Sequence, residues 1–267
     1  MPRGISRYDE ARLQGRLLTP AFARPDLWYD AADLSTITVA TGASQWRDKS
    51  GSNRHLVQPT ATQQPALSLN AQNGLSVLTF DGSNDFMSNP SVGASGLSVI
   101  HIIAVFRMIS GGASEDIPMG VGPTGAQGAI RAFYRLNNGT TVGFGGWSTD
   151  ITASVYSYDI GGSFHIFEIF NTQLATPNQI RIGRDGLITT YSVGTLNPTV
   201  DGFSVGSLQG GAVGNYYSNI AVGEILVKYS EWPLRERQLI HGYLGWRWGT
   251  LLDASGPFVN RPPLIGD

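Results

Sequence analysis

The strongest hydrophobic pattern in this chain of 267 residues lies near its end, in residues 217–249. Residues 220–228 are apolar and β-branched at nearly every position, which predicts a strand covered on both faces. Downstream of Pro233, side chains recur at helical spacing, with Leu239 and Trp246 widening the stripe: Ile240, Tyr243, Leu244 and Arg247. The pattern predicts a central strand followed by one short helix near 233–248, with Pro233 as its first residue and Gly249 at its end.

Two glycines inside the predicted helix, Gly242 and Gly245, lower its intrinsic stability by about 1 kcal/mol each relative to alanine. A helix that keeps them is held by packing, and their missing side chains allow another segment to approach closely. We expect the helix to cap one end or edge of a sheet, with Trp246 and Trp248 packed there.

The rest of the chain reads as a succession of strands. Alternating aromatic and polar residues mark short strands in 27–35 and 44–51, with a turn at 48–51. Longer apolar runs occupy 97–107, 129–135, 140–144, 163–171 and 179–184. The pairs Asn138-Gly139 and Asp185-Gly186 stand between such runs and predict tight hairpin turns. This pattern favours an all-β fold, and we detect no internal repeat.

Composition agrees with a chain rich in strands and turns. Glycine contributes 34 residues, charged residues are only 14%, and a hydrophobic content of 41% over this length can fill the core of one domain. The formal net charge of -2 provides no general attraction to nucleic acid or to an anionic membrane. No cysteine is present, which excludes disulfides and thiolate metal sites. We find no apolar run that predicts a membrane span and no secretory signal in 1–25.

The two ends differ from the middle. Residues 1–25 predict an N-terminal arm, and residues 250–267 predict a tail in which Pro257, Pro262 and Pro263 resist regular structure. Arginine is favoured at protein interfaces, which suggests an assembly role for the arginines of the two arms: Arg3, Arg7, Arg12, Arg16, Arg24 and Arg261. The alternative explanation for the excess of arginine is codon bias in a GC-rich genome. The alternative for the N-terminal arm is a strap that lies on its own domain.

Three blocks near the start and one at the end carry a family resemblance. The opening blocks are Trp28 to Asp33, Trp46 to Gly51 and Phe80 to Asp85, which follow the patterns W-x-D-A-x-D, W-x-D-K-S-G and F-D-G-x-x-D. The closing block runs from Glu224 to Gly249 and is similar to A-E-I-x-V-Y followed by E-R-Q-x-x-x-G-Y-L-A-W-K-W-G. Together they resemble the laminin G-like jelly-roll domains of the concanavalin A-like lectin/glucanase superfamily, in the form found in bacteriophage structural proteins. The chain departs from the pattern at Tyr29, Pro233 and Gly245, where leucine, a Ser or Thr cap and alanine are more usual.

This resemblance brackets residues 26–249 as one domain and implies an antiparallel two-sheet jelly roll with a C-terminal helix and extended arms. It also implies a non-enzymatic virion protein, a capsid decoration, head or tail component assembled in the host cytoplasm. Its expected partners are other capsid or tail subunits and further copies of itself, with a trimer suggested by analogy to virion appendages. Two alternatives stay open: a carbohydrate-binding module for host or surface glycans, and a glycan hydrolase or lyase.

The sequence offers little catalytic chemistry. Glycosidases need two facing carboxylates, but the adjacent pair Glu115-Asp116 would point to opposite faces of a strand. Glu168 and Glu224 lie in apolar strands, where we expect buried structural hydrogen bonds, for Glu224 with Arg47 or with the helix. The four histidines are widely separated and are expected in the core or at interfaces: His55, His101, His165 and His241. We therefore predict no catalytic residues and no metal site.

Two sets of residues are candidates for binding a glycan or calcium. Aromatic side chains near predicted loops are candidates for a glycan platform: Tyr134, Trp147, Tyr156, Tyr158, Tyr216 and Tyr217. Asp81, Asn84 and Asp85 cluster oxygen atoms on one turn and are the candidates for calcium, although an Asx-turn explains the same residues. No other cofactor is expected.

Overall fold

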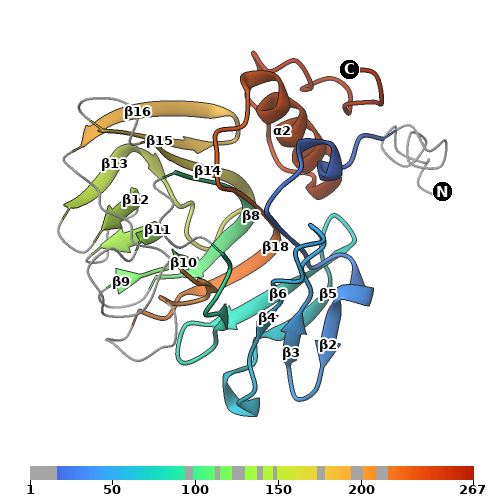
Figure 1. The fold of residues 1–267 in the computed structure, drawn as a ribbon, viewed down its shortest axis with the longest axis vertical. Helices are drawn as coiled ribbons and strands as arrows, with labels where there is room; N and C mark the ends of the chain where they lie inside the picture. Colours follow the sequence, from blue (N-terminus) through green and yellow to red (C-terminus); the bar gives the residue numbers. More distant parts are fainter. Residues whose placement is uncertain are drawn as a thin grey trace.

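The protein is a sandwich of two antiparallel β-sheets with one helix on the outer face of the first sheet (Figure 1). The computed structural model describes residues 17–93, 99–111, 115–121, 130–136, 141–146, 149–172, 178–193, 201–208 and 216–267. This architecture confirms the expected all-β, two-sheet class with a C-terminal helix. Within the described residues, no helix is long and apolar enough to cross a membrane.

The first sheet has the strand order β16-β15-β14-β8-β18-β6-β5, and β1 also pairs with β18. Its strands are β1 (Leu27–Asp30), β5 (Ala66–Gln72), β6 (Leu75–Asp81), β8 (Ile100–Ser110), β14 (His165–Thr172), β15 (Asn178–Arg184), β16 (Leu187–Val193) and β18 (Asn219–Lys228). The turn between β15 and β16 is the predicted Asp185-Gly186 hairpin, with both residues at positive φ.

The second sheet has the order β13-β12-β11-β10-β17-β7-β4-β3-β2, and β9 pairs with β11. Its strands are β2 (Ile37–Val39), β3 (Ala43–Trp46), β4 (Leu56–Val57), β7 (Met87–Asn89), β9 (Glu115–Asp116), β10 (Met119–Val121), β11 (Ile130–Leu136), β12 (Thr141–Gly146), β13 (Thr149–Ser157) and β17 (Phe203–Val205). Short 3-10 helices connect some of these elements: η1 (Pro20–Ala23), η2 (Leu34–Thr36) and η3 (Ala61–Gln63). The predicted Asn138-Gly139 turn lies outside the described residues.

Strand β18 is the central strand that its apolar sequence predicts. It pairs with β8 along one edge, while its other edge is shared by β6, opposite Asn219–Val222, and by β1, opposite Glu224–Val227. All of its residues except the two terminal ones are buried. The strand therefore connects the beginning, middle and end of the sequence in one sheet.

A β-bulge at Gly223 decides which way the side chains of β18 point. Pairing with β8 shifts register between Val222 and Glu224, so that Ile220 and Val222 before the bulge, and Ile225 and Val227 after it, all face the core between the sheets. Ala221 and Leu226 face the helix instead. An extra residue reverses the alternation of a strand. The bulge thus places Glu224 on the helix side, where an uninterrupted strand would have turned it into the apolar core.

Helix α2 (Leu234–Trp248) covers the outer face of the first sheet (Figure 1). Pro233 is the residue before the helix rather than its first residue, and Gly249 ends it in the left-handed conformation at φ 64°. Ile240, Tyr243 and Leu244 are buried in a second core, with Trp248 and the indole of Trp232. The expected packing of Trp248 is confirmed, but the helix lies on the outer face of the sheet rather than at an end or edge, and Trp246 is half-buried against the tail.

The glycines of α2 are contact points for the C-terminal tail. A Cβ atom added to Gly242 would lie 2.7 Å from Phe258, and one added to Gly245 would lie 2.6 Å from Leu252. Phe258 is buried against the helix, and the indole nitrogen of Trp246 donates to its carbonyl at 2.6 Å. The close approach expected at these glycines is real, and the segment that approaches is the tail of the same chain.

The described part of the N-terminal segment also lies on its own domain. Leu17 forms an isolated antiparallel bridge with Leu264 of the tail. The carbonyl oxygen of Ala23 accepts hydrogen bonds from the Trp232 indole at 2.9 Å and from Lys228 Nζ at 3.1 Å. For residues 17–25 the strap alternative is therefore correct, while residues 1–16 lie outside the described residues.

Candidate functional site

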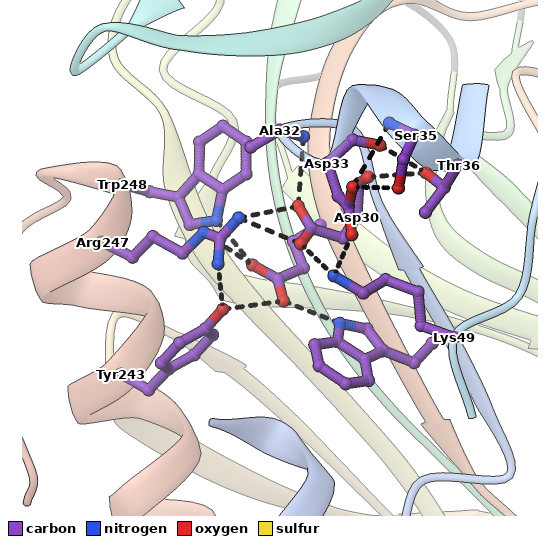
Figure 2. A network of polar contacts seen from close by, with 11 residues as sticks. Asp30, Ala32, Asp33, Ser35, Thr36, Lys49, Tyr243, Arg247 and Trp248 are labelled. Atoms are coloured by element: carbon purple, nitrogen blue, oxygen red, sulfur yellow. Dashed lines mark hydrogen bonds and ion pairs between the residues drawn. The ribbon is translucent and has the colours of Figure 1, made fainter. Parts of the chain in front are cut away.

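Residues of the first two opening blocks and of the closing block meet in one buried polar network, which we call the motif network (Figure 2). Pairing of β1 with β18 places Asp30 directly opposite Glu224. Arg247, from the last turn of α2, donates to both carboxylate oxygens of Asp30 at 2.9 and 3.0 Å and lies 3.7 Å from Glu224. Figure 2 shows Arg247 and Lys49 approaching Asp30 from different segments, and Lys49 Nζ is 2.9 Å from its carboxylate.

Glu224 accepts hydrogen bonds from three aromatic side chains. The indole nitrogens of Trp28 and Trp248 donate at 2.8 and 2.9 Å, and the Tyr243 hydroxyl donates at 3.3 Å. Glu224 is fully buried. Burial raises the pKa of Glu224 to about 7, and the negative charge of Asp30 adds to the effect, while Arg247 and the indole donors oppose it.

The motif network shows what the first two opening blocks and the closing block contribute to the fold. Asp48, from the second block, accepts from the backbone nitrogen of Trp28 at 3.0 Å and of Ser50 at 2.8 Å, which confirms the predicted turn. Of the two partners expected for Glu224, the helix is correct and Arg47 is wrong, because the Arg47 side chain donates to Gln45 at 3.3 Å. The opening and closing blocks therefore encode a structural connection between β1, β18 and α2.

A second buried carboxylate, Glu168 on β14, lies under the first half of α2. It accepts from His101 Nε2 at 2.7 Å, from His241 Nε2 at 2.8 Å and from Arg237 Nε at 2.6 Å. Burial acts to raise the pKa of Glu168, but the hydrogen bonds from the two histidines outweigh it and hold the pKa well below its usual value. Glu168 is the buried, hydrogen-bonded residue that the sequence predicts.

The tautomer of His101 follows from its partners. Its Nε2 donates to the Glu168 carboxylate, and its Nδ1 accepts from the backbone nitrogen of Trp232 at 3.3 Å. This is the neutral ring, in agreement with burial, which lowers the pKa of His101. Two other histidines are also hydrogen-bonded. His55 Nδ1 accepts from the backbone nitrogen of Asp48 at 3.1 Å, and His165 Nδ1 donates to the Asp185 carboxylate at 2.6 Å.

Neither buried glutamate is placed like a reactive carboxylate. Glu168 is 1% exposed and Glu224 is 0% exposed, and the protein's own donors contact both oxygens of each. In the adjacent pair Glu115-Asp116, Asp116 has a structural role, since it is buried and its carboxylate accepts a hydrogen bond from Arg135 Nε at 2.6 Å. Within the described part of the chain, no group of three or more His, Asp or Glu residues could hold a metal ion.

The turn considered for calcium forms an Asx-turn. One oxygen of Asp81 accepts from the backbone nitrogens of Ser83 at 2.7 Å, Asn84 at 3.1 Å and Asp85 at 3.3 Å. Burial, with the nearby charge of Asp81, raises the pKa of Asp85 to about 6. Both carboxylates thus accept hydrogen bonds from backbone N–H groups that close the turn.

Of the six aromatic candidates for a glycan platform, the structure describes the side chains of four. Tyr156 and Tyr158 are buried, with 6% and 1% exposure, and belong to the core between the sheets. Tyr216 and Tyr217 are half-buried. Trp147 and the side chain of Tyr134 lie outside the described residues.

Of the six arginines assigned to the arms, the structure describes two. Arg24 ends η1 at a φ of 44°, and its carbonyl accepts from Lys228 at 3.0 Å. Arg261 pairs with Asp267 in the tail at 2.7 Å. Arg3, Arg7, Arg12 and Arg16 lie outside the described residues.

A cavity of about 200 Å³ lies between α2, the β15–β16 turn and the tail, and we call it the tail cavity. The helix contributes Leu234, Arg237, Gln238 and His241, which share one face at helical spacing. The tail crosses the opposite side, where the backbone nitrogen of Asp253 donates to the carbonyl of Asp185 at 2.8 Å. No sequence signal pointed to this cavity, because the β15–β16 turn that completes it is distant in the chain from the helix and the tail.

Comparisons with known proteins show the fold. No family model matches the chain, and no curated protein matches it. Among solved structures, it is similar to Trypanosoma rangeli sialidase in complex with sialic acid, with a TM-score of 0.54 and 11% identity over 84% of this chain and 33% of the sialidase. It is also similar to the binding domain of botulinum neurotoxin serotype C1, with a TM-score of 0.55 and 12% identity over 84% of this chain and 52% of that domain.

The chain thus spans about a third of the sialidase and about half of the toxin domain. At these identities the likeness is one of fold, and it places the chain among β-sandwich domains of the kind that these two proteins contain.

Proposed function

We propose that this chain is a non-enzymatic structural domain of a bacteriophage particle, displayed as a capsid decoration, head or tail component. The motif network carries the proposal. Three of the four blocks that resemble phage structural proteins, separated by as much as 217 positions between Asp30 and Arg247, meet in one set of buried contacts. The resemblance therefore involves residues that act together in the folded chain.

The surroundings of the two buried glutamates, Glu168 and Glu224, support the non-enzymatic part of the proposal. Each carboxylate is surrounded by donors that the fold itself supplies, and each is closed to solvent. A glycosidase needs one carboxyl group that can donate a proton to the substrate and a second that can attack or activate water. Both oxygens of Glu168 are held by groups of the protein.

Mass spectrometry of purified particles, produced from the genome that encodes the chain, tests the proposal. We expect the chain in intact particles at a constant ratio to the major capsid or tail subunit. Immunogold labelling then distinguishes head from tail. A chain recovered only as a free monomer, and absent from particles, would refute the proposal.

A second candidate, compatible with the first, is a carbohydrate-binding module for host or surface glycans. It is favoured by the two fold neighbours, one a sialidase solved with sialic acid and the other a toxin binding domain. A broad glycan array, probed with and without calcium, tests this candidate. Binding of a defined glycan class supports it, and a blank array with folded protein contradicts it.

A further inference from the structure

The tail cavity contains polar groups whose hydrogen-bonding capacity the described protein does not use. His241 is 7% exposed, and its Nε2 donates to Glu168, so in the neutral ring Nδ1 is an acceptor; this Nδ1 is buried and has no hydrogen-bond partner among the described residues. Buried polar atoms are rarely left unpaired in folded proteins. His241 lines the tail cavity, and a ligand hydroxyl that reaches this Nδ1 would satisfy it.

Other groups around the cavity add both donors and acceptors. Arg237 uses Nε and Nη2 on Glu168, which leaves Nη1 without a partner in the described part of the chain. The side-chain amide of Gln238 makes no hydrogen bond to any described residue. Asp253 accepts from the Ser255 hydroxyl through one oxygen only. A ligand that fits this set must both donate and accept, which is a property of hydroxyl groups.

The charged groups of the lining disfavour an anionic ligand. Arg237 is paired with Glu168 at 2.6 Å, and Asp185 is paired with His165 at 2.6 Å. Asp253, which also lines the cavity, adds a carboxylate. A second anion beside this carboxylate would be repelled, whereas the hydroxyl groups of a neutral ligand can donate to it.

The size and walls of the cavity limit the ligand further. Its volume of about 200 Å³ is smaller than the roughly 300–1,000 Å³ of pockets for drug-sized molecules, so it admits a ligand of one ring. The tail contributes apolar residues to the lining, among them Leu252, Pro257 and Val259, while the helix contributes polar ones. A sugar ring has this division between C–H surface and hydroxyl groups.

We propose that the tail cavity binds a neutral, hydroxyl-rich ligand of one-ring size, such as a single hexose unit of a glycan. The inference rests on the carbohydrate-binding candidate above and assigns it a site. The helix provides the hydrogen bonds through Gln238, His241 and Arg237, and the tail provides the apolar wall.

The test is a ligand-observed NMR titration of the full chain with D-glucose, D-galactose and D-mannose, and with the corresponding uronic acids. Two variants probe the cavity: Gln238→Ala removes an amide, and Leu234→Trp fills the entrance from a side chain that is 65% exposed. Glu236→Ala is the matched control, on the same helix and outside the cavity lining.

We expect one neutral hexose to bind, Gln238→Ala to weaken binding by about tenfold, Leu234→Trp to abolish it, and the control to bind as wild type. Thermal unfolding checks that all variants are folded. No binding of any neutral hexose, or stronger binding of a uronic acid, would overturn the inference. If wild type and Leu234→Trp gave the same glycan-array signal, the tail cavity would not be the binding site, although the carbohydrate-binding candidate would stand. A blank array for the wild type would reject the carbohydrate-binding candidate itself.

Discussion

Replacing Arg247 with leucine tests the motif network most directly. Arg247 donates two hydrogen bonds to Asp30, which is fully buried, and one at 2.5 Å to the Tyr243 hydroxyl. Leucine fills part of the space but removes the cation. Asp30 then keeps Lys49 and the backbone nitrogen of Ala32 as partners, and it still lies opposite Glu224.

The expected cost follows from the contacts that are lost. Hydrogen bonds to charged groups are worth about 1.5–3 kcal/mol each, and removal of one partner from a buried ion pair costs about 3–5 kcal/mol. We expect Arg247→Leu to lower the free energy of unfolding by about 3–5 kcal/mol, a large part of the roughly 5–15 kcal/mol typical of a domain. The corresponding fall in Tm is roughly 6–20 °C for a chain of this size.

Urea denaturation at pH 7, with thermal unfolding as a second measurement, determines this value. The control is Arg181→Leu, which removes an ion pair to Glu231 between side chains that are 31% and 45% exposed. Such surface pairs contribute about 0–1 kcal/mol. Arg247→Lys keeps the charge without the two-pronged geometry and should fall between the two. Equal effects of Arg247→Leu and Arg181→Leu would show that the network contributes no more than a surface pair, and the reasoning would be refuted.

Four further predictions follow from the buried groups and close contacts. Because the pKa of Glu224 is raised to about 7, its contribution to stability is present below about pH 4.5 and is lost as the pH rises through 7. Between pH 4 and pH 8.5, the free energy of unfolding of wild type should therefore fall by roughly 3 kcal/mol more than that of Glu224→Gln. The same pH dependence in both proteins, measured by urea denaturation, would contradict this. The pKa of Glu168 is lowered, so Glu168→Gln should reduce the free energy of unfolding by about 3–5 kcal/mol at pH 7 and by less below pH 4. If this variant instead abolished a glycan cleavage activity of the wild type and left Tm unchanged, Glu168 would be a catalytic residue. Gly223→Ala places a Cβ 2.7 Å from the Trp248 ring and should cost about 1–3 kcal/mol in urea denaturation. Leu244→Ala opens the core under the helix and should cost about 2–5 kcal/mol, and an unchanged Tm would show that the helix is peripheral.

Much of the fold could be predicted from local patterns. Continuous apolar runs correctly indicated β8, β11, β12, β14, β15 and β18, with boundaries displaced by up to a few residues. Short or polar strands such as β9, β13 and β17 were not predicted, because pairing with neighbours, and not their own composition, makes them strands.

The candidate sites were less predictable than the fold. The contact of Glu224 with the helix was expected, but not its position on the helix side of β18, which depends on the bulge at Gly223. Glu168 was expected to be hydrogen-bonded, yet its histidine partners come from β8 and from α2, 67 and 73 positions away in the chain. No local pattern specifies such pairings.

The sequence by itself determined the class of fold, the central strand, the final helix and the residues of the motif blocks. These features follow from the periodicity of apolar side chains and from turn residues, which act over a few positions. Only the tertiary structure decided that the motif residues form one network, that Glu168 gathers two histidines and an arginine, and that the tail encloses a cavity against α2. Those features depend on register, on one bulge and on contacts between distant segments, because a buried charge is stabilised by whichever groups the folded chain brings to it.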